Sequence, residues 1–258
     1  MCSTIACQKT DISLEQAYLN NSHEELDRFF VEWASKSEPK RMSEYAKLDT
    51  IEKSIYAFFR DFYAKKYEYC INRSRLTDDY TRAEYIVIQN TIPRIFLISG
   101  KDTSLYEPNL ELWLTHYVDA VNFEPKELEP LTNFRPNVKI KEKKTLFLFD
   151  EYEQKLNDFL FVDQFAGRGL RESPPDSLRR EIMNRRDFIT SKIVIVKNHW
   201  AWNWYYFTFP SIKYLSFSND MKLLKVNARE GYASGHEFIY LNKNGTWIEI
   251  GEEGSWNE

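Results

Sequence analysis

Residues 236–250 read HEFIYLNKNGTWIEI. Runs rich in apolar residues flank Asn244-Gly245 on both sides, and this pair is typical of a two-residue turn between antiparallel strands. The pattern therefore predicts strands over 236–242 and 246–250, joined as a hairpin. Similar runs precede the hairpin, with turn residues at 219–220 and 233–235, and they cover 192–198, 203–209, 212–218 and 222–230. We expect all these runs to form one antiparallel β-meander at the C-terminal end.

The N-terminal part carries helical patterns instead. Ser13 with Gln16, and Ser22 with Glu25, have the spacing of a capping box at the start of a helix. Apolar residues then recur at helical spacing, which predicts a helix over 13–36 and a second one over 43–66. The two apolar stripes are Leu26, Phe29, Phe30 and Trp33 in the first helix, and Leu48, Ile51, Ile55, Phe58, Phe59 and Phe62 in the second. We expect the two helices to pair through these stripes.

The middle of the chain has mixed patterns. Residues 83–98 are either two short strands or a buried helix interrupted by Pro93, and 105–123 is a helix or an irregular segment. Three prolines within 124–137 favour a linker there. Beyond the linker we expect short strands over 138–140 and 146–149, and helices over 150–160 and 177–189.

These patterns predict an α+β fold, in which a helical N-terminal part packs with a C-terminal antiparallel β-meander. We expect one composite domain with four parts: a tether or signal remnant (1–12), a mainly helical part (13–123), the linker (124–137), and an α+β part that contains the sheet (138–258).

Composition excludes several classes of protein. Of the 258 residues, 43% are hydrophobic and 16% aromatic, which suits a folded chain with a substantial core. The formal net charge of -4 gives no general attraction to nucleic acid, so no nucleic-acid partner is predicted. The eight glycines form no phosphate-binding motif, and the cysteines and histidines form no zinc motif, so neither a cofactor nor a metal is predicted. No apolar run reaches the 18 residues of a membrane-spanning helix.

The most unusual segment is 199–209, HWAWNWYYFTF. In an extended strand Trp200, Trp202 and Trp204 would share one face, with His199 and Tyr205 on the other. Such a strip either packs beneath the N-terminal helices or forms a platform for a sugar ring or a peptide. His236 lies in the same predicted sheet, and it is either an ordinary hydrogen-bonded histidine or a neighbour of His199 in one site.

The N-terminus contains Thr4-Ile5-Ala6-Cys7 followed by polar residues, which looks like the end of a bacterial lipoprotein signal with Cys7 as the lipidated residue. Only six residues precede Cys7, so the alternative is an incidental cysteine in a frayed cytosolic terminus. Further stretches resemble uncharacterised exported lipoproteins of Bacteroidetes-type bacteria, and the last strands are similar to the end of NTF2-like sheets. The stretches are NNSHEELDRFF (20–30), NHWAWNW (198–204), KVNAREGY (225–232) and NGTWI (244–248).

This resemblance implies an exported protein and assigns no catalytic residue. We therefore expect a non-catalytic binding or accessory protein of the bacterial cell envelope, attached to the membrane only through lipid at Cys7. Its ligand would be a protein, peptide or glycan held near the tryptophan strip, His199, Tyr205 and His236. Two alternatives stay open: a hydrolase of glycan or peptide that uses His199, His236 and Glu237, and a cytoplasmic interaction protein of the immunity type.

Overall fold

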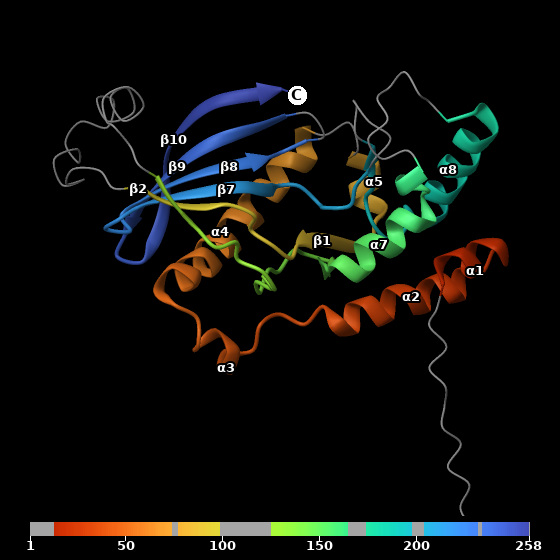
Figure 1. Ribbon diagram of the computed structural model, residues 1–258, viewed down its shortest axis with the longest axis horizontal. Helices are drawn as coiled ribbons and strands as arrows, with labels where there is room; N and C mark the ends of the chain where they lie inside the picture. The colour runs from red at the N-terminus through yellow and green to blue at the C-terminus, as the bar shows by residue number, and fades with distance from the viewer. Residues whose placement is uncertain are drawn as a thin grey trace, which may run out of the picture.

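The computed structural model describes residues 13–73, 77–98, 125–164, 174–197, 204–231 and 234–257. Helices dominate its N-terminal part and antiparallel strands its C-terminal part, so the α+β prediction is confirmed (Figure 1). The α-helices of the described residues are α1 (Leu14–Leu19), α2 (His23–Lys36), α3 (Met42–Tyr45), α4 (Thr50–Arg73), α5 (Thr77–Arg82), α7 (Asp150–Phe159) and α8 (Asp176–Ile189).

Within the described residues, the main sheet has six strands in the order β10-β9-β8-β7-β2-β3. Its meander consists of β7 (Ser211–Ser218), β8 (Leu223–Arg229), β9 (Ser234–Lys243) and β10 (Thr246–Asn257), all antiparallel. Lys243 pairs with Thr246 around Asn244 and Gly245, which have φ angles of 54° and 84°. The positive φ at both positions is what the Asn-Gly pair provides most easily, so the predicted hairpin is confirmed.

Two strands from the middle of the chain extend the meander. β2 (Ile95–Ile98) runs parallel to β7, and β3 (Pro125–Leu128) pairs antiparallel with β2 at the edge of the sheet. A separate parallel pair joins β1 (Tyr85–Gln89) to β4 (Lys144–Leu148). Residues 83–98 therefore contain two strands, and the alternative of a buried helix is wrong.

The first two runs of the predicted meander do not join the main sheet. They form β5 (Val196–Lys197) and β6 (Trp204–Tyr205), an antiparallel pair of their own within the described residues. The segment after β6 instead lies next to β1, where Thr208 donates its N–H to the carbonyl of Val87 at 2.7 Å. The Thr208 hydroxyl accepts the Val87 N–H at 2.8 Å.

The predicted linker at 124–137 is also part of the fold. It contains β3, and Leu131 forms a backbone bridge with Ile92. The apolar side chains between its prolines, Leu131 and Phe134, are buried, which explains why this proline-containing stretch is not an exposed connection. The expected strand over 138–140 is absent, and 105–123 and 1–12 lie outside the described residues.

Each long predicted helix is divided. The first breaks at Asn21, whose φ is 46°, and Ser22 then caps α2 by accepting the N–H of Glu25 at 3.2 Å. In the second, Asp49 and Glu52 form a reciprocal capping box at the start of α4. The helices α7 and α8 match the expected ranges within one residue.

The helices cover different parts of the core, so the expected pairing of the first two apolar stripes is wrong. In α2, the Trp33 indole donates to the carbonyl of Phe147 at 2.8 Å and its ring stacks on Tyr152 at 4.6 Å. This cluster lies between α2, α7, α8 and the β1–β4 pair. Helix α4 lies against the main sheet instead (Figure 1). Its Phe58 and Phe62 belong to the core cluster there, with the Phe58 ring 4.9 Å from that of Tyr240.

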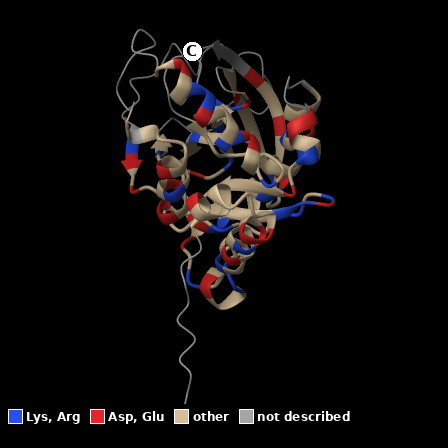
Figure 2. Cartoon of the chain, turned by 90° about the vertical axis from the view of Figure 1, so that its right-hand side faces the viewer, with Lys and Arg blue, Asp and Glu red and all other residues tan. Residues whose placement is uncertain are grey.

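Charges are interleaved on the side of the molecule at the right of Figure 1, where Figure 2 shows alternating acidic and basic segments. In α8, Arg185 pairs with Glu181 and Glu15, and Arg186 pairs with Asp79. Arg185 and Arg186 thus form ion pairs within the fold. Among the described residues, no helix combines the length and the apolar character needed to cross a membrane.

Candidate functional site

Half of the predicted aromatic site lies outside the described residues, namely His199, Trp200 and Trp202. Trp204 is only 7% exposed and belongs to the core cluster between α2, α7 and α8. Tyr205 is half-buried, and the Arg229 guanidinium lies 4.5 Å from the centre of its ring. Trp204 and Tyr205, the described end of the aromatic strip, therefore pack against other residues of the fold. A ligand platform formed by His199, Trp200 and Trp202 stays a prediction.

His236 lies at the start of β9 between two carboxylates. Its Nδ1 is 2.5 Å from Oε2 of Glu230, a side chain that is 6% exposed, and its Nε2 is 3.4 Å from Oε1 of Glu252. The other Glu230 oxygen, Oε1, is buried and has no hydrogen-bond partner among the described residues. The register pairs Ala228 with His236. The short turn after β8 thus brings Glu230 back to the imidazole.

Glu237, the carboxylate named with His236 in the hydrolase alternative, follows it in β9, and successive side chains in a strand point to opposite faces. Glu237 instead accepts hydrogen bonds from the Tyr214 hydroxyl and from the Asn227 amide at 3.1 Å, and it pairs with Lys225 at 2.7 Å. Burial raises the pKa of Glu237, but these partners outweigh it and lower the pKa below the usual range. Burial and the neighbouring Glu237 raise the pKa of Tyr214 to about 12. Glu237 and Lys225 thus form an ion pair, and Tyr214 beside them is protonated at neutral pH.

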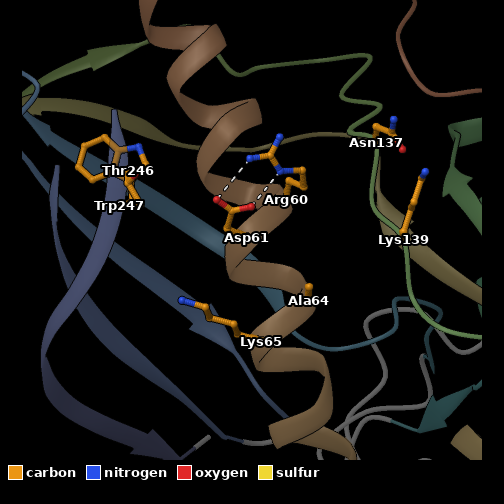
Figure 3. Close-up of a pocket in the computed structure, with 8 residues that line it drawn as sticks. All are labelled: Arg60, Asp61, Ala64, Lys65, Asn137, Lys139, Thr246 and Trp247. Carbon is orange, nitrogen blue, oxygen red and sulfur yellow. Dashed lines mark hydrogen bonds and ion pairs between the residues drawn. The ribbon is translucent and has the colours of Figure 1, made fainter. Parts of the chain in front are cut away.

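A pocket of about 610 Å³ opens between α4, the segment 137–139 and the start of β10 (Figure 3). Helix α4 buries Phe58, Phe59, Phe62 and Tyr63 against the core, so the residues between these positions face outward. The lining residues are Arg60, Asp61, Ala64 and Lys65 of α4, Asn137 and Lys139, and Thr246 and Trp247 of β10.

The pocket is positively charged. Arg60 is engaged by Asp61 at 2.8 Å, the ion pair drawn in Figure 3. Lys65 and Lys139 are exposed, and neither side chain has a hydrogen bond or an ion pair within the described part of the chain. Three cations and one carboxylate give a formal charge of about +2 at neutral pH, in a chain whose net charge is -4.

Trp247 closes one side of the pocket. It is 7% exposed, and its ring lies 6.3 Å from Phe58 and 6.0 Å from Phe217, so packing fixes its orientation. Figure 3 shows the indole nitrogen on the side of the ring that faces α4. The Asn137 amide and the Thr246 hydroxyl add neutral hydrogen-bonding groups to the same pocket.

A second pocket of about 350 Å³ continues along α4 from the first. The two share Ala64 and Lys139. The remaining residues of the second pocket are Tyr67, Glu68, Ile71, Tyr80, Thr81, Ile140, Lys141, Glu142 and Lys143. Together the pockets follow one face of the helix from Arg60 to Ile71.

None of the pocket residues was a candidate on sequence grounds. Those of the first pocket come from three segments that are far apart in the chain, so no local spacing joins them. One signal existed: Lys65 falls between the apolar positions of α4 and is therefore exposed. Within the described residues, no group of three or more His, Cys, Asp or Glu side chains is placed to hold a metal ion.

Comparisons with protein-family models, with curated proteins and with solved structures each found no match to this chain.

Proposed function

We propose that this is a binding protein that holds an anionic ligand in the pocket between α4 and β10. The observation that carries the proposal is that Lys65 and Lys139 both line this pocket and have no acidic partner among the described residues. Some other lysines of the described fold are neutralised by acidic residues: Lys192 pairs with Glu84 and Asp27, and Lys36 pairs with Glu32 and Glu151.

The lining supports binding rather than chemistry. Its carboxylate, Asp61, is engaged by Arg60, and the lining has no His or Cys. An anion in this pocket would be attracted by the positive charge of the lysines and would accept a hydrogen bond from a neutral donor of the lining, such as Asn137 or the Trp247 indole. The wall formed by Ala64 and Trp247 suits an apolar portion of the same ligand.

Glutarate and inorganic phosphate are suitable probes, measured by isothermal titration calorimetry at low salt. We expect glutarate to bind with a Kd of about 1 mM, an affinity of about -4 kcal/mol. The double variant Lys65→Ala/Lys139→Ala should weaken it by about fivefold, because each exposed charge contributes about 0.2–1 kcal/mol. Lys126→Ala is the matched control, an exposed lysine on β3 at the opposite edge of the sheet. Equal affinity in all three proteins, or no binding of either probe, refutes the proposal.

A second candidate is a hydrolase of glycan or peptide, and the short contact between His236 and Glu230 favours it. The Glu230 carboxylate would orient the imidazole through Nδ1, and Nε2, which lies 3.4 Å from the exposed Glu252 carboxylate, would act as a general base once a substrate displaces Glu252. Hydrolysis of peptide or glycan substrates that disappears in His236→Gln would support this candidate. Equal rates in the variant would remove it.

For its location we propose the bacterial cell envelope, with lipid at Cys7; a cytoplasmic protein is the alternative. The residues Thr4-Ile5-Ala6-Cys7 support the anchor. The intact mass of the protein purified from its natural source tests it. A diacyl or triacyl addition on Cys7 is expected, and an unmodified chain that begins at Met1 would contradict it.

A further inference from the structure

The two pockets along α4 adjoin each other, because Ala64 and Lys139 line both of them. Their volumes are about 610 and 350 Å³. Both values lie within the range of about 300–1,000 Å³ that is usual for small-ligand sites. A ligand built of two units therefore has room for one unit in each pocket.

The second pocket is polar. Five of its eleven lining residues are charged, and three more carry a hydroxyl group. The charged residues are Glu68, Lys139, Lys141, Glu142 and Lys143, and the hydroxyl groups belong to Tyr67, Tyr80 and Thr81. This pocket therefore suits a hydrophilic unit, since an apolar one would leave polar groups of the lining without partners in the complex.

The charged groups that remain open to a ligand have both signs. Lys65 and Lys139 have no acidic partner within the described part of the chain, and the exposed Glu68 has no basic partner there. The other charged groups of the two pockets have partners, namely Arg60 with Asp61, Lys141 with Glu142, and Lys143 with the carbonyls of Thr81 and Ala83. A complementary ligand thus carries an anion for the lysines and a hydrogen-bond donor for the Glu68 carboxylate.

These open groups lie close together. Glu68 follows Lys65 by three residues in α4, so the two side chains share one face of the helix. At a rise of about 1.5 Å per residue they are about 4.5 Å apart along the helix axis. Lys65 lines the first pocket and Glu68 the second, and Lys139 lines both. The anion and the donor can therefore belong to one small ligand.

Hydroxyl groups suit this mixture of charges, because each hydroxyl both donates and accepts hydrogen bonds. One ligand hydroxyl would donate to Glu68, and a neighbouring one would accept from Lys139. A phosphate polymer has closely spaced negative charges, which the carboxylates of Glu68 and Glu142 would repel. A nucleotide base stacks on an open aromatic face, whereas the rings of Tyr67 and Trp247 are buried to more than nine-tenths.

We infer that the anionic ligand of these pockets is an acidic sugar, with its carboxylate at Lys65 and Lys139 and the hydroxyl groups of an adjoining sugar unit at Glu68. The C–H groups of the sugar would be the apolar portion that meets Ala64 and Trp247. The inference rests on the proposed function, because the carboxylate would occupy the proposed anion pocket.

Isothermal titration calorimetry on the whole protein at low salt tests this inference. The probes are glucuronate, which is a single acidic sugar, and cellobiouronate, in which glucuronate is joined to glucose. Cellobiose is the neutral counterpart of the second probe, and glutarate is an anion without hydroxyl groups. We expect cellobiouronate to bind about fivefold more tightly than glucuronate, because its second unit adds hydrogen bonds to a charged group. Cellobiose should bind at least about fivefold more weakly than cellobiouronate, because it lacks the carboxylate.

Variants separate the two pockets. Lys65→Ala/Lys139→Ala should weaken both glutarate and cellobiouronate by about fivefold. Glu68→Ala should weaken cellobiouronate by about threefold, because a hydroxyl loses its acceptor. The same variant should not weaken glutarate, because it removes a negative charge near the anion. Lys126→Ala should change neither ligand.

The outcomes distinguish this inference from the proposed function. If glutarate binds in the pocket but cellobiouronate binds no more tightly than glucuronate, the acidic sugar is wrong and the anion pocket stands. If Glu68→Ala weakens glutarate as much as cellobiouronate, or weakens neither, Glu68 does not recognise a sugar hydroxyl and the inference fails. If none of the anionic probes binds, both proposals fail.

Discussion

Replacing Glu84 with Gln tests the ion-pair network that joins the two parallel strands to the helices. Glu84 precedes β1 and accepts from Lys144 of β4 at 2.7 Å and from Lys192, which follows α8, at 2.6 Å. Lys192 also reaches Asp27 of α2 at 2.7 Å. Burial raises the pKa of Glu84, but the hydrogen bonds and charges of the two lysines outweigh it and lower the pKa to about 2.

The magnitude follows from this pKa. A difference of 1 in pKa corresponds to about 1.4 kcal/mol, so the fall from 4.5 to about 2 sets an upper limit of about 3.4 kcal/mol. The Glu84 side chain is 34% exposed and Lys144 is 64% exposed, so solvent screens part of this energy. We expect Glu84→Gln to lower the free energy of unfolding at neutral pH by about 1–2 kcal/mol.

The effect has a defined pH dependence. The pKa of Glu84 is lower in the folded protein, so its stabilisation is complete above the unfolded value of 4.5 and is lost as the pH falls towards 2. Urea denaturation at about pH 7, 5 and 3 should show a difference between wild type and variant that shrinks at the lowest pH. Glu129→Gln, an exposed carboxylate on the same chain, is the control and should change little. A difference that is the same at every pH, or none at pH 7, would refute the reasoning.

Three further outcomes are expected. Arg185→Met should lower the free energy of unfolding, measured by urea denaturation, by about 2–3 kcal/mol, because it leaves the two acidic partners of a buried guanidinium unpaired. A loss below about 0.5 kcal/mol would be too small for such ion pairs and would contradict this prediction. Cys70 is buried, and burial raises the pKa of its thiol. In a Cys2→Ser/Cys7→Ser variant, this thiol should therefore react with Ellman's reagent far more slowly in the folded protein than in denaturant. Equal rates under the two conditions would contradict its burial. Gly245→Ala should lower the free energy of unfolding by about 1 kcal/mol, because the backbone φ of 84° is strained for a residue with a side chain although the space around it is open. An unchanged midpoint of denaturation would contradict this prediction and show that the turn relaxes.

Local signals predicted the parts of the fold that are local in the chain. The Asn244-Gly245 turn and the runs around the other turns predicted the meander from β7 to β10, and the helices expected over 150–160 and 177–189 are α7 and α8. Short connections keep neighbouring strands together, so the sequence pattern and the spatial order agree there.

Contacts between distant segments had no such signal. The parallel pairing of Ile95 with Leu215 joins positions 120 residues apart, and nothing in either strand specifies the other. The prolines of 124–137 predicted a linker, but Leu131 and Phe134 of this segment belong to the core. The anion pocket also depends on distant segments, because its lysines come from α4 and from a loop more than 70 residues later.

The most direct test of the anion pocket is the indole N–H resonance of Trp247, assigned with Trp247→Phe and followed by ¹H–¹⁵N NMR as glutarate is added. We predict a saturable shift of this resonance in the wild type and in Lys126→Ala, and its loss in Lys65→Ala/Lys139→Ala. A resonance that does not move, or that moves equally in the double variant, would contradict binding at this pocket.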